Sequence, residues 1–289
     1  MVDGVTDAPR KPFWLLPNLL SLDAPLVAVV WLYLFAKTWG VNYHPVHGYV
    51  VLALVVWVMY VGDRLLDSAL LGDSSRSQAR HRFHKKHRRK FLWVAGIAGL
   101  AALGMVLWKI PMAIFSYVIV EAFLVTGFFA MAVFTAPETE EIPYAKNILA
   151  GAAFAFGTAM VAHVYLYDRG IRDLLFSREF TCFALLCILN ISAIDLWEHA
   201  NRSPDPEVKA ADELALTLPL TLLGTAALVF ALKAEDHGSR PFFYAILTGA
   251  ALLHILNRTR SRFSMESLRV LADVALVAPA LVFFAVSGP

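Results

Sequence analysis

An apolar run long enough to cross a lipid bilayer ends in the stretch Trp57-Val-Met-Tyr-Val-Gly-Asp-Arg-Leu-Leu-Asp67. Asp63 and Asp67 are four residues apart, so on a helix their carboxylates share one face, one turn from each other. Two like charges at the end of a membrane helix cost free energy unless a cation holds them. Mg²⁺ is the natural candidate, because it takes oxygen ligands and accepts one or two carboxylates together with a substrate phosphate. Arg64 would neutralise one carboxylate or reach a phosphate. The alternative is an interfacial cluster that only ends the helix.

The composition indicates a membrane protein with several helical spans. Hydrophobic residues make up 58% of the 289 residues, and the mean hydropathy of +0.61 is far above that of soluble domains. Apolar runs of about twenty residues recur, each long enough for a helix across a bilayer. The expected fold class is therefore all-α, with a single integral membrane domain over residues 1–289. Because the first fifteen residues are polar and contain proline, we expect no cleavable signal peptide.

Nine membrane spans are predicted from the apolar runs, and the charges of the loops orient them. The spans are roughly 21–39, 47–67, 91–108, 112–134, 146–167, 179–199, 213–232, 241–257 and 268–287. One side collects most of the lysine and arginine, including those of the N-terminal segment 1–20 and of the loop 74–90. By the positive-inside rule we expect that side to be cytoplasmic, with the N-terminus inside and the C-terminus outside. A sequence without organelle-targeting features fits a plasma (inner) membrane.

The predicted cytoplasmic loop 74–90 carries eight lysine and arginine residues and three histidines. It either anchors the protein to anionic lipid headgroups or guides an anionic substrate to the adjacent aspartate pair. His81, His84 and His87 recur every three residues, a spacing found among metal ligands. The surrounding cations would repel a metal ion, so we do not predict a metal site in this loop.

A second polar cluster ends the sixth predicted span, with Asn190, Asp195 and Glu198. Asp195 and Glu198 are three residues apart and share a helix face at the same predicted depth as the first aspartate pair. Two helices that each bring an acidic pair to one membrane surface predict a shared cation site, which would hold Mg²⁺ and through it a diphosphate. Lys146 begins the fifth span on this side, where it would bind a phosphate or only snorkel to the interface.

The order of these motifs resembles that of the UbiA superfamily of intramembrane prenyltransferases. Four segments carry the resemblance: Asp63-Arg-Leu-Leu-Asp67, Ile142-Pro-Tyr-Ala-Lys-Asn147, Asp195-Leu-Trp-Glu198 and Thr217-Leu-Pro219. The first segment is similar to the second half of the family's first aspartate-rich motif, and the second to the Pro-x-x-Lys-Asn that opens its fifth helix. The third segment is similar to the family's second aspartate-rich motif, and the fourth to the Thr-Leu-Pro that follows it. The family's first motif normally begins with Asn-Asp, where this chain has Met59 and Tyr60.

The resemblance implies a Mg²⁺-dependent reaction at the cytoplasmic ends of the helices. It assigns metal binding and catalysis to four carboxylates, Asp63, Asp67, Asp195 and Glu198. The implied substrate-binding residues are Arg64, Lys146, Tyr60, Asn190, Trp57, Trp197 and Arg258. The metal and the cations would make the diphosphate of an isoprenoid a good leaving group, and the aromatic rings would stabilise the allylic cation. The aromatic residues could instead form an interfacial belt, and Arg258 could only satisfy the positive-inside rule.

The fate of the allylic cation separates the enzyme hypotheses. In prenyl transfer an aromatic or lipid acceptor attacks the cation, whereas in a UbiA-type terpene cyclase the double bonds of its own chain do so. Tyr60 in place of a polar motif residue favours cyclisation slightly, but the number of known prenyltransferases makes transfer our main expectation. The third hypothesis, a non-catalytic lipid-binding bundle, predicts no dependence on divalent ions. Expected partners are an isoprenoid diphosphate and membrane lipids and not nucleic acid, and the oligomeric state does not follow from the sequence.

Three ionisable residues, Glu121, His163 and Asp273, lie inside predicted spans. Groups at this depth usually face the interior of the bundle. We expect Asp273 to pair structurally, while Glu121 and His163 either line an acceptor pocket or pair with polar groups of other helices. Cys182 and Cys187 share one apolar run and are expected to be small core residues rather than a disulfide or a metal site.

Overall fold

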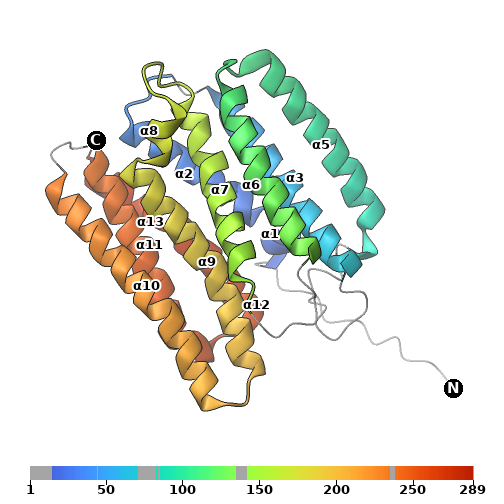
Figure 1. The fold of residues 1–289 in the computed structure, drawn as a ribbon, viewed down its shortest axis with the longest axis vertical. Helices are drawn as coiled ribbons and strands as arrows, with labels where there is room; N and C mark the ends of the chain where they lie inside the picture. Colours follow the sequence, from blue (N-terminus) through green and yellow to red (C-terminus); the bar gives the residue numbers. More distant parts are fainter. Residues whose placement is uncertain are drawn as a thin grey trace.

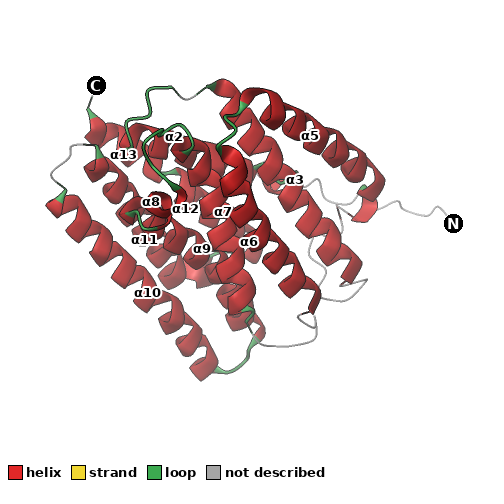
Figure 2. Cartoon of the chain, turned by 45° about the horizontal axis from the view of Figure 1, so that its top comes forward, coloured by secondary structure: helices red, strands yellow, loops and turns green. Residues whose placement is uncertain are grey.

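The computed structural model describes residues 15–43, 45–70, 83, 85–134, 142–234 and 238–288. The side chains of residues 67, 68, 70 and 134 are not described. The described residues form helices and the loops that connect them. These ranges contain no β-strand, which confirms the all-α class. The long helices run side by side, and the loops between them lie at the two ends of the bundle (Figure 1; Figure 2).

Eight helical segments of the described residues are long and apolar enough to cross a membrane. Seven of them are α3 (Val46–Leu70), α5 (Arg88–Lys109), α6 (Ile114–Phe134), α7 (Tyr144–His163), α9 (Arg178–Arg202), α10 (Pro206–Lys233) and α11 (Ser239–Thr259), which continues as η2 (Arg260–Arg262). The eighth combines α12 (Met265–Val277) and α13 (Pro279–Ser287), because Pro279 lacks a backbone N–H and interrupts the helix. Two short helices, α1 (Leu16–Leu19) and α8 (Ile171–Leu175), lie in connecting segments.

Eight of the nine predicted spans coincide with these membrane-length segments, most with boundaries a few residues from those expected. The start of α10 differs most, at Pro206 rather than near 213, because its polar first turns extend the helix beyond the apolar run. The first predicted span, 21–39, is α2 (Asp23–Thr38), whose 16 residues reach only about 24 Å. About 20 apolar residues are needed to cross the hydrocarbon core, so a ninth crossing stays a prediction.

The helix α2 lies in the core and contacts α3, α7, α11, α12 and α13. It is apolar on all faces, as is typical of a helix surrounded by other helices, and Trp31, Leu34 and Phe35 are fully buried. The Trp31 ring stacks on Phe183 of α9 with 4.4 Å between centroids, and its Nε1 donates a hydrogen bond of 2.8 Å to the carbonyl oxygen of Leu276 in α12. These contacts fix α2 against two helices that also contribute to the candidate site.

The helices α5 and α6 lie at the outside of the bundle and present large apolar side chains outward (Figure 1). Trp93, Trp108 and Phe123 are 76%, 84% and 84% exposed. Exposed apolar surface of this extent is expected where lipid rather than water covers the protein. The buried residues of α5 are Phe91, Ala98 and Ala102, which shows how little of this helix the bundle encloses.

The backbones of α7 and α9 are in close contact at Gly151. A Cβ atom placed on Gly151 would lie 2.6 Å from Cγ1 of Ile188 and 2.7 Å from the Cα and backbone N of Ile188. No side chain fits there, so glycine permits the contact between the two helices. Asn147 and Asp195 lie one to two turns from this contact, toward the end of the bundle that carries the predicted site.

Candidate functional site

We call the end of the bundle where α3 and α9 finish and α7 and α12 begin the site end, toward the bottom of Figure 1. The first turn of α7 connects the two acidic motifs at this end. Lys146 Nζ lies 3.9 Å from Oδ1 of Asp63 in α3, and Asn147 Nδ2 donates a hydrogen bond of 2.9 Å to Oδ2 of Asp195 in α9. Two consecutive residues of one helix therefore contact carboxylates on the two helices on either side.

The end of α3 is held by the segment around α1. Arg64 is 4% exposed, and its Nη1 donates a hydrogen bond to the carbonyl oxygen of Asn18. The Asn18 side chain donates a hydrogen bond of 2.6 Å to Oδ2 of Asp23 at the start of α2. Arg64, which is predicted to bind substrate, thus also has a structural role, because it bonds the backbone of α1. Sequence reasoning did not identify Asn18 or Asp23 as parts of this region.

The second acidic residue of α9 has a cationic neighbour. Glu198 forms an ion pair with Arg269 in the first turns of α12, and the Arg269 side chain is 7% exposed. The sequence predicts Glu198 as a metal ligand and gives no indication that Arg269 is its neighbour. A long-range ion pair of this kind has no signal in sequence spacing, because the two residues lie 71 positions apart.

Replacing Arg269 by methionine is expected to lower the free energy of unfolding by about 2 kcal/mol, because it removes a cation from beside a partly buried carboxylate. The double variant Arg269→Met/Glu198→Met should recover most of this loss, since no charge then remains to be desolvated. Thermal unfolding of the purified protein in detergent measures both effects. If the loss in the double variant equals the sum of the losses in Arg269→Met and Glu198→Met, the two residues make no energetic coupling through the ion pair.

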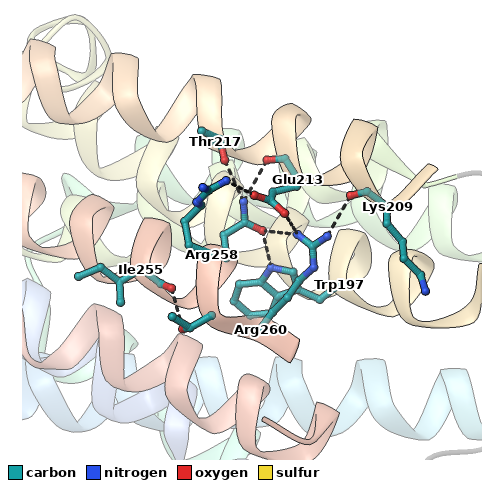
Figure 3. A network of polar contacts seen from close by, with 9 residues as sticks. Trp197, Lys209, Glu213, Thr217, Ile255, Arg258 and Arg260 are labelled. Atoms are coloured by element: carbon teal, nitrogen blue, oxygen red, sulfur yellow. Dashed lines mark hydrogen bonds and ion pairs between the residues drawn. The ribbon is translucent and has the colours of Figure 1, made fainter. Parts of the chain in front are cut away.

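Trp197 and Arg258 lie in a separate polar network between α9, α10 and α11, shown in Figure 3. Trp197 is 1% exposed, and its Nε1 donates a hydrogen bond of 2.9 Å to Oδ1 of Asn257. Asn257 Nδ2 donates in turn to the Glu213 carbonyl oxygen at 3.0 Å and to the Thr217 hydroxyl at 3.1 Å. The buried polar groups of Asn257 are thus satisfied within the network.

Arg258 points to the rim of this network, where its guanidinium bonds the Glu213 carboxylate (Figure 3). Arg260 lies 3.5 Å from the other carboxylate oxygen of Glu213 and also donates to the Lys209 carbonyl oxygen at 2.9 Å. The structure therefore joins Trp197 to Asn257 of α11 and Arg258 to Glu213 of α10. Their positions favour a role in packing α10 against α11 over direct contact with a diphosphate.

Changing Asn257 to leucine is expected to lower the free energy of unfolding by about 2 kcal/mol, because the buried Trp197 N–H loses its acceptor. Thr259→Val on the same helix is the matched control. The Thr259 hydroxyl bonds only the Ile255 carbonyl oxygen one turn earlier, so its removal should cost less than about 0.5 kcal/mol. Equal losses in the two variants, measured by thermal unfolding in detergent, would contradict this assignment.

A cavity of about 20 Å³ lies between α2, α3, α7, α9 and α12. Tyr60, Phe154, Asn190 and Asp273 are among the side chains that line it. The rings of Tyr60 and Phe154 meet edge to face with 6.4 Å between centroids. Two residues predicted to contact substrate, Tyr60 and Asn190, are therefore brought together, and Asp273, expected to have only a structural role, joins them.

Trp57 of α3 has other neighbours than Tyr60. Its Nε1 donates a hydrogen bond of 2.9 Å to the carbonyl oxygen of Leu20, and its ring lies 6.5 Å from that of Phe91 in α5. The helix α5 belongs to the outer part of the bundle, so the structure places Trp57 away from the cavity and among residues that join α3 to α5.

Several predicted features lie outside the described residues. The backbone of Asp67 is part of α3, but its side chain is not described. In the basic loop 74–90 the described residues are Phe83 and 85–90, so His81 and His84 lie outside. The N-terminal segment 1–20 is described only from residue 15.

Glu121 and His163 lie away from the site end. His163 is the last residue of α7, about 25 Å along the helix from Lys146, and its Nδ1 lies 2.8 Å from the hydroxyl of Tyr117. The Glu121 carboxylate lies against Gly157 in the middle of α7, where a Cβ would be only 3.1 Å from its Oε1. His163 therefore pairs with another helix, which is one of the two roles expected for it.

The donor chemistry of the site end fits Mg²⁺. Asp63 and Asp195 supply carboxylate oxygens on either side of Lys146 and Asn147, and Mg²⁺ is commonly held by one or two carboxylates together with substrate phosphate and water. Within the described ranges, no group of three or more histidine, cysteine, aspartate or glutamate side chains could hold a metal ion by itself. Asp63 and Asp195 are the described carboxylates that would hold such an ion, with phosphate and water as its other ligands.

No protein-family model, curated protein sequence or solved structure matches the chain.

Proposed function

We propose that the chain is a Mg²⁺-dependent intramembrane enzyme of the UbiA type, which ionises an isoprenoid diphosphate and transfers the prenyl group to a lipophilic or aromatic acceptor. One observation carries the proposal. Lys146 and Asn147, consecutive residues at the start of α7, contact Asp63 and Asp195 on two other membrane helices. The two acidic motifs thus meet at one end of the bundle around a lysine and the N-terminus of a helix.

This arrangement suits the recognition of a diphosphate. The first turn of α7 has no side-chain cap, and its backbone N–H groups and the positive end of the helix dipole both favour anions. Lys146 adds a full positive charge beside them. Asp63 and Asp195 would hold Mg²⁺, which supplies Lewis-acid stabilisation of the negative charge that develops on the departing diphosphate.

The apolar interior of the bundle, next to the site end, would protect an allylic cation from bulk water. Tyr60 and Phe154 bring two aromatic rings together in this part of the bundle, with 6.4 Å between centroids, and aromatic faces attract cations. The same pair of rings is the observation that favours the second candidate function, terpene cyclisation. In that reaction the cation is consumed by double bonds of its own chain, and no acceptor is needed.

The location follows from the distribution of charge and belongs to the same proposal. The site end carries Lys146, Arg202, Lys209, Arg258, Arg260, Arg262 and Arg269, while the opposite end has Lys37, Lys109, Arg169, Arg172, Arg178, Lys233 and Arg240. The described basic residues 85, 86 and 88–90 join the site end, because α5 begins there. On the positive-inside rule we propose that the site end is cytoplasmic, and that the protein lies in a plasma membrane.

The test is an incubation of the purified protein in detergent with geranyl, farnesyl or geranylgeranyl diphosphate and Mg²⁺. Diphosphate release and extractable products are measured with and without aromatic and lipid acceptors. Prenylated acceptor that disappears when EDTA removes Mg²⁺ is the expected result. A cyclic hydrocarbon without acceptor would establish the cyclase instead. If the protein shows no turnover and no Mg²⁺-dependent binding of diphosphate, only the hypothesis of a non-catalytic lipid-binding bundle remains.

A further inference from the structure

One side chain that lines the cavity between α2, α3, α7, α9 and α12 has a buried oxygen without a hydrogen-bond partner in the described residues. Asn190 is 5% exposed and lines the cavity, and its Oδ1 has no hydrogen bond within the described part of the chain. A buried amide oxygen without a donor is costly, and in folded proteins such atoms are usually satisfied by protein or by ordered water. The side chains of Tyr60 and Asp273 contribute further polar groups to the same wall.

The size of the cavity selects its occupant. A water molecule needs about 10–15 Å³ of accessible volume and two to four polar partners. The volume of about 20 Å³ meets this requirement and is too small for an organic molecule. Asn190 offers an acceptor, Tyr60 a hydroxyl, and Asp273 a carboxyl group, so the lining offers enough polar groups for one water molecule.

We propose that this cavity binds one water molecule, and that this water captures the allylic cation when no acceptor is present, so that the chain converts an isoprenoid diphosphate into the prenyl alcohol. The inference rests on the proposed function, because it needs the cation that diphosphate ionisation creates. It adds an activity and a water-binding site, with Asn190 as positioning residue and Asp273 as proton acceptor.

The depth of the cavity supports this assignment. Tyr60 precedes Asp63 by three residues on α3, and Asn190 precedes Asp195 by five on α9, so both lie deeper in the bundle by about 4.5 and 7.5 Å. Asp273 follows Arg269 by four residues on α12, about 6 Å deeper. If the carboxylates hold the diphosphate, the prenyl chain extends into the bundle. Its first carbon then lies close to the depth of the cavity.

The chemical step is balanced without an oxidant or a reductant. The bond between the first prenyl carbon and the diphosphate oxygen breaks, and its electron pair leaves with the diphosphate. The water oxygen forms a bond to that carbon, and one water proton passes to the carboxylate of Asp273. The products are a prenyl alcohol and inorganic diphosphate.

Isotopic oxygen identifies this route. The purified protein is incubated with farnesyl diphosphate and Mg²⁺ in ¹⁸O-labelled water without acceptor, and the products are analysed by mass spectrometry. The expected result is farnesol that contains ¹⁸O, together with unlabelled diphosphate. Label in the phosphate product instead would show cleavage of the phosphorus–oxygen bond and overturn the proposal. So would acceptor prenylation without any farnesol in the acceptor-free reaction.

Two variants test the assigned residues. Asn190→Leu, similar in shape, and Asp273→Asn should each lower farnesol formation at least about tenfold, because each weakens the hydrogen bonds that hold the water. The control is Ser192→Ala, since Ser192 is buried on α9 but does not line the cavity, and it should leave farnesol formation unchanged.

A second measurement separates this inference from the proposed function. Mg²⁺-dependent binding of farnesyl thiodiphosphate, a slowly reacting analogue, should be the same within about twofold in Asp273→Asn and Ser192→Ala, because neither residue is among those expected to bind the substrate. Normal analogue binding and normal farnesol formation in both cavity variants would overturn the inference and leave the proposed function intact. Absence of Mg²⁺-dependent analogue binding in the unchanged protein would overturn both.

Discussion

Replacing Asp195 by asparagine is expected to lower Mg²⁺-dependent turnover of an isoprenoid diphosphate by at least about 100-fold. The asparagine side chain has the same shape and keeps an oxygen that can accept the hydrogen bond from Asn147. The contact between α7 and α9 should therefore survive, and only the negative charge that would hold the metal is removed. Release of diphosphate, measured at saturating substrate over a range of Mg²⁺ concentrations, is the direct readout.

Asp63→Asn should have an effect of the same size, because Asp63 is the carboxylate on the other side of Lys146. The matched control is Glu213→Gln, which changes a carboxylate at the same end of the bundle. Glu213 pairs with Arg258 and Arg260 in the network of Figure 3. If Asp195→Asn keeps more than half of the turnover, or Glu213→Gln loses as much, the assignment of the metal-binding carboxylates is wrong.

Gly151→Ala is expected to be the most disruptive single substitution of a small residue, with a loss of about 3 kcal/mol in the free energy of unfolding. The added Cβ would lie 2.7 Å from backbone atoms of Ile188, and backbone cannot move aside as a flexible side chain does. The helices α7 and α9 must separate, which pulls Asn147 away from Asp195. Turnover should therefore fall together with stability.

The control for Gly151→Ala is Gly99→Ala on the outer helix α5. A Cβ on Gly99 meets no atom within 4 Å, so alanine should be neutral or slightly stabilising through its better helix propensity. Thermal unfolding in detergent and diphosphate release are measured for both variants. A melting temperature for Gly151→Ala equal to that of Gly99→Ala would mean that the two helices are not in close contact at Gly151.

The membrane-length helices were predictable because their signal is local. A run of about twenty apolar residues must form a helix in lipid, whatever its neighbours are. The start of α10 was predicted less accurately. Its first residues, from Pro206 to about 213, are helical but polar, so they do not extend the apolar run. The burial of α2 had a weaker signal, since an apolar helix in the core and one in lipid have the same composition.

The partners of the site residues were not predictable, because they depend on how each helix is rotated about its axis. Spacing placed Asp63 and Asp195 at one end of the bundle, but it could not show that Asn147 bonds Asp195. It also could not show that Glu198 pairs with Arg269, or that Trp197 faces Asn257 and not a substrate. Each of these contacts joins residues at least 48 positions apart, where helix periodicity carries no information.

The shortness of α2 affects how the protein would respond to the thickness of its bilayer. A helix whose hydrophobic length differs from that of the surrounding lipid tilts or deforms the bilayer, at a modest cost for each ångström of mismatch. That cost applies to helices in contact with lipid, such as α5 and α6, whereas α2 is enclosed by other helices. Thicker or thinner membranes should therefore tilt the outer helices first, while Trp31 and Phe35 keep α2 in register with the helices that carry the site.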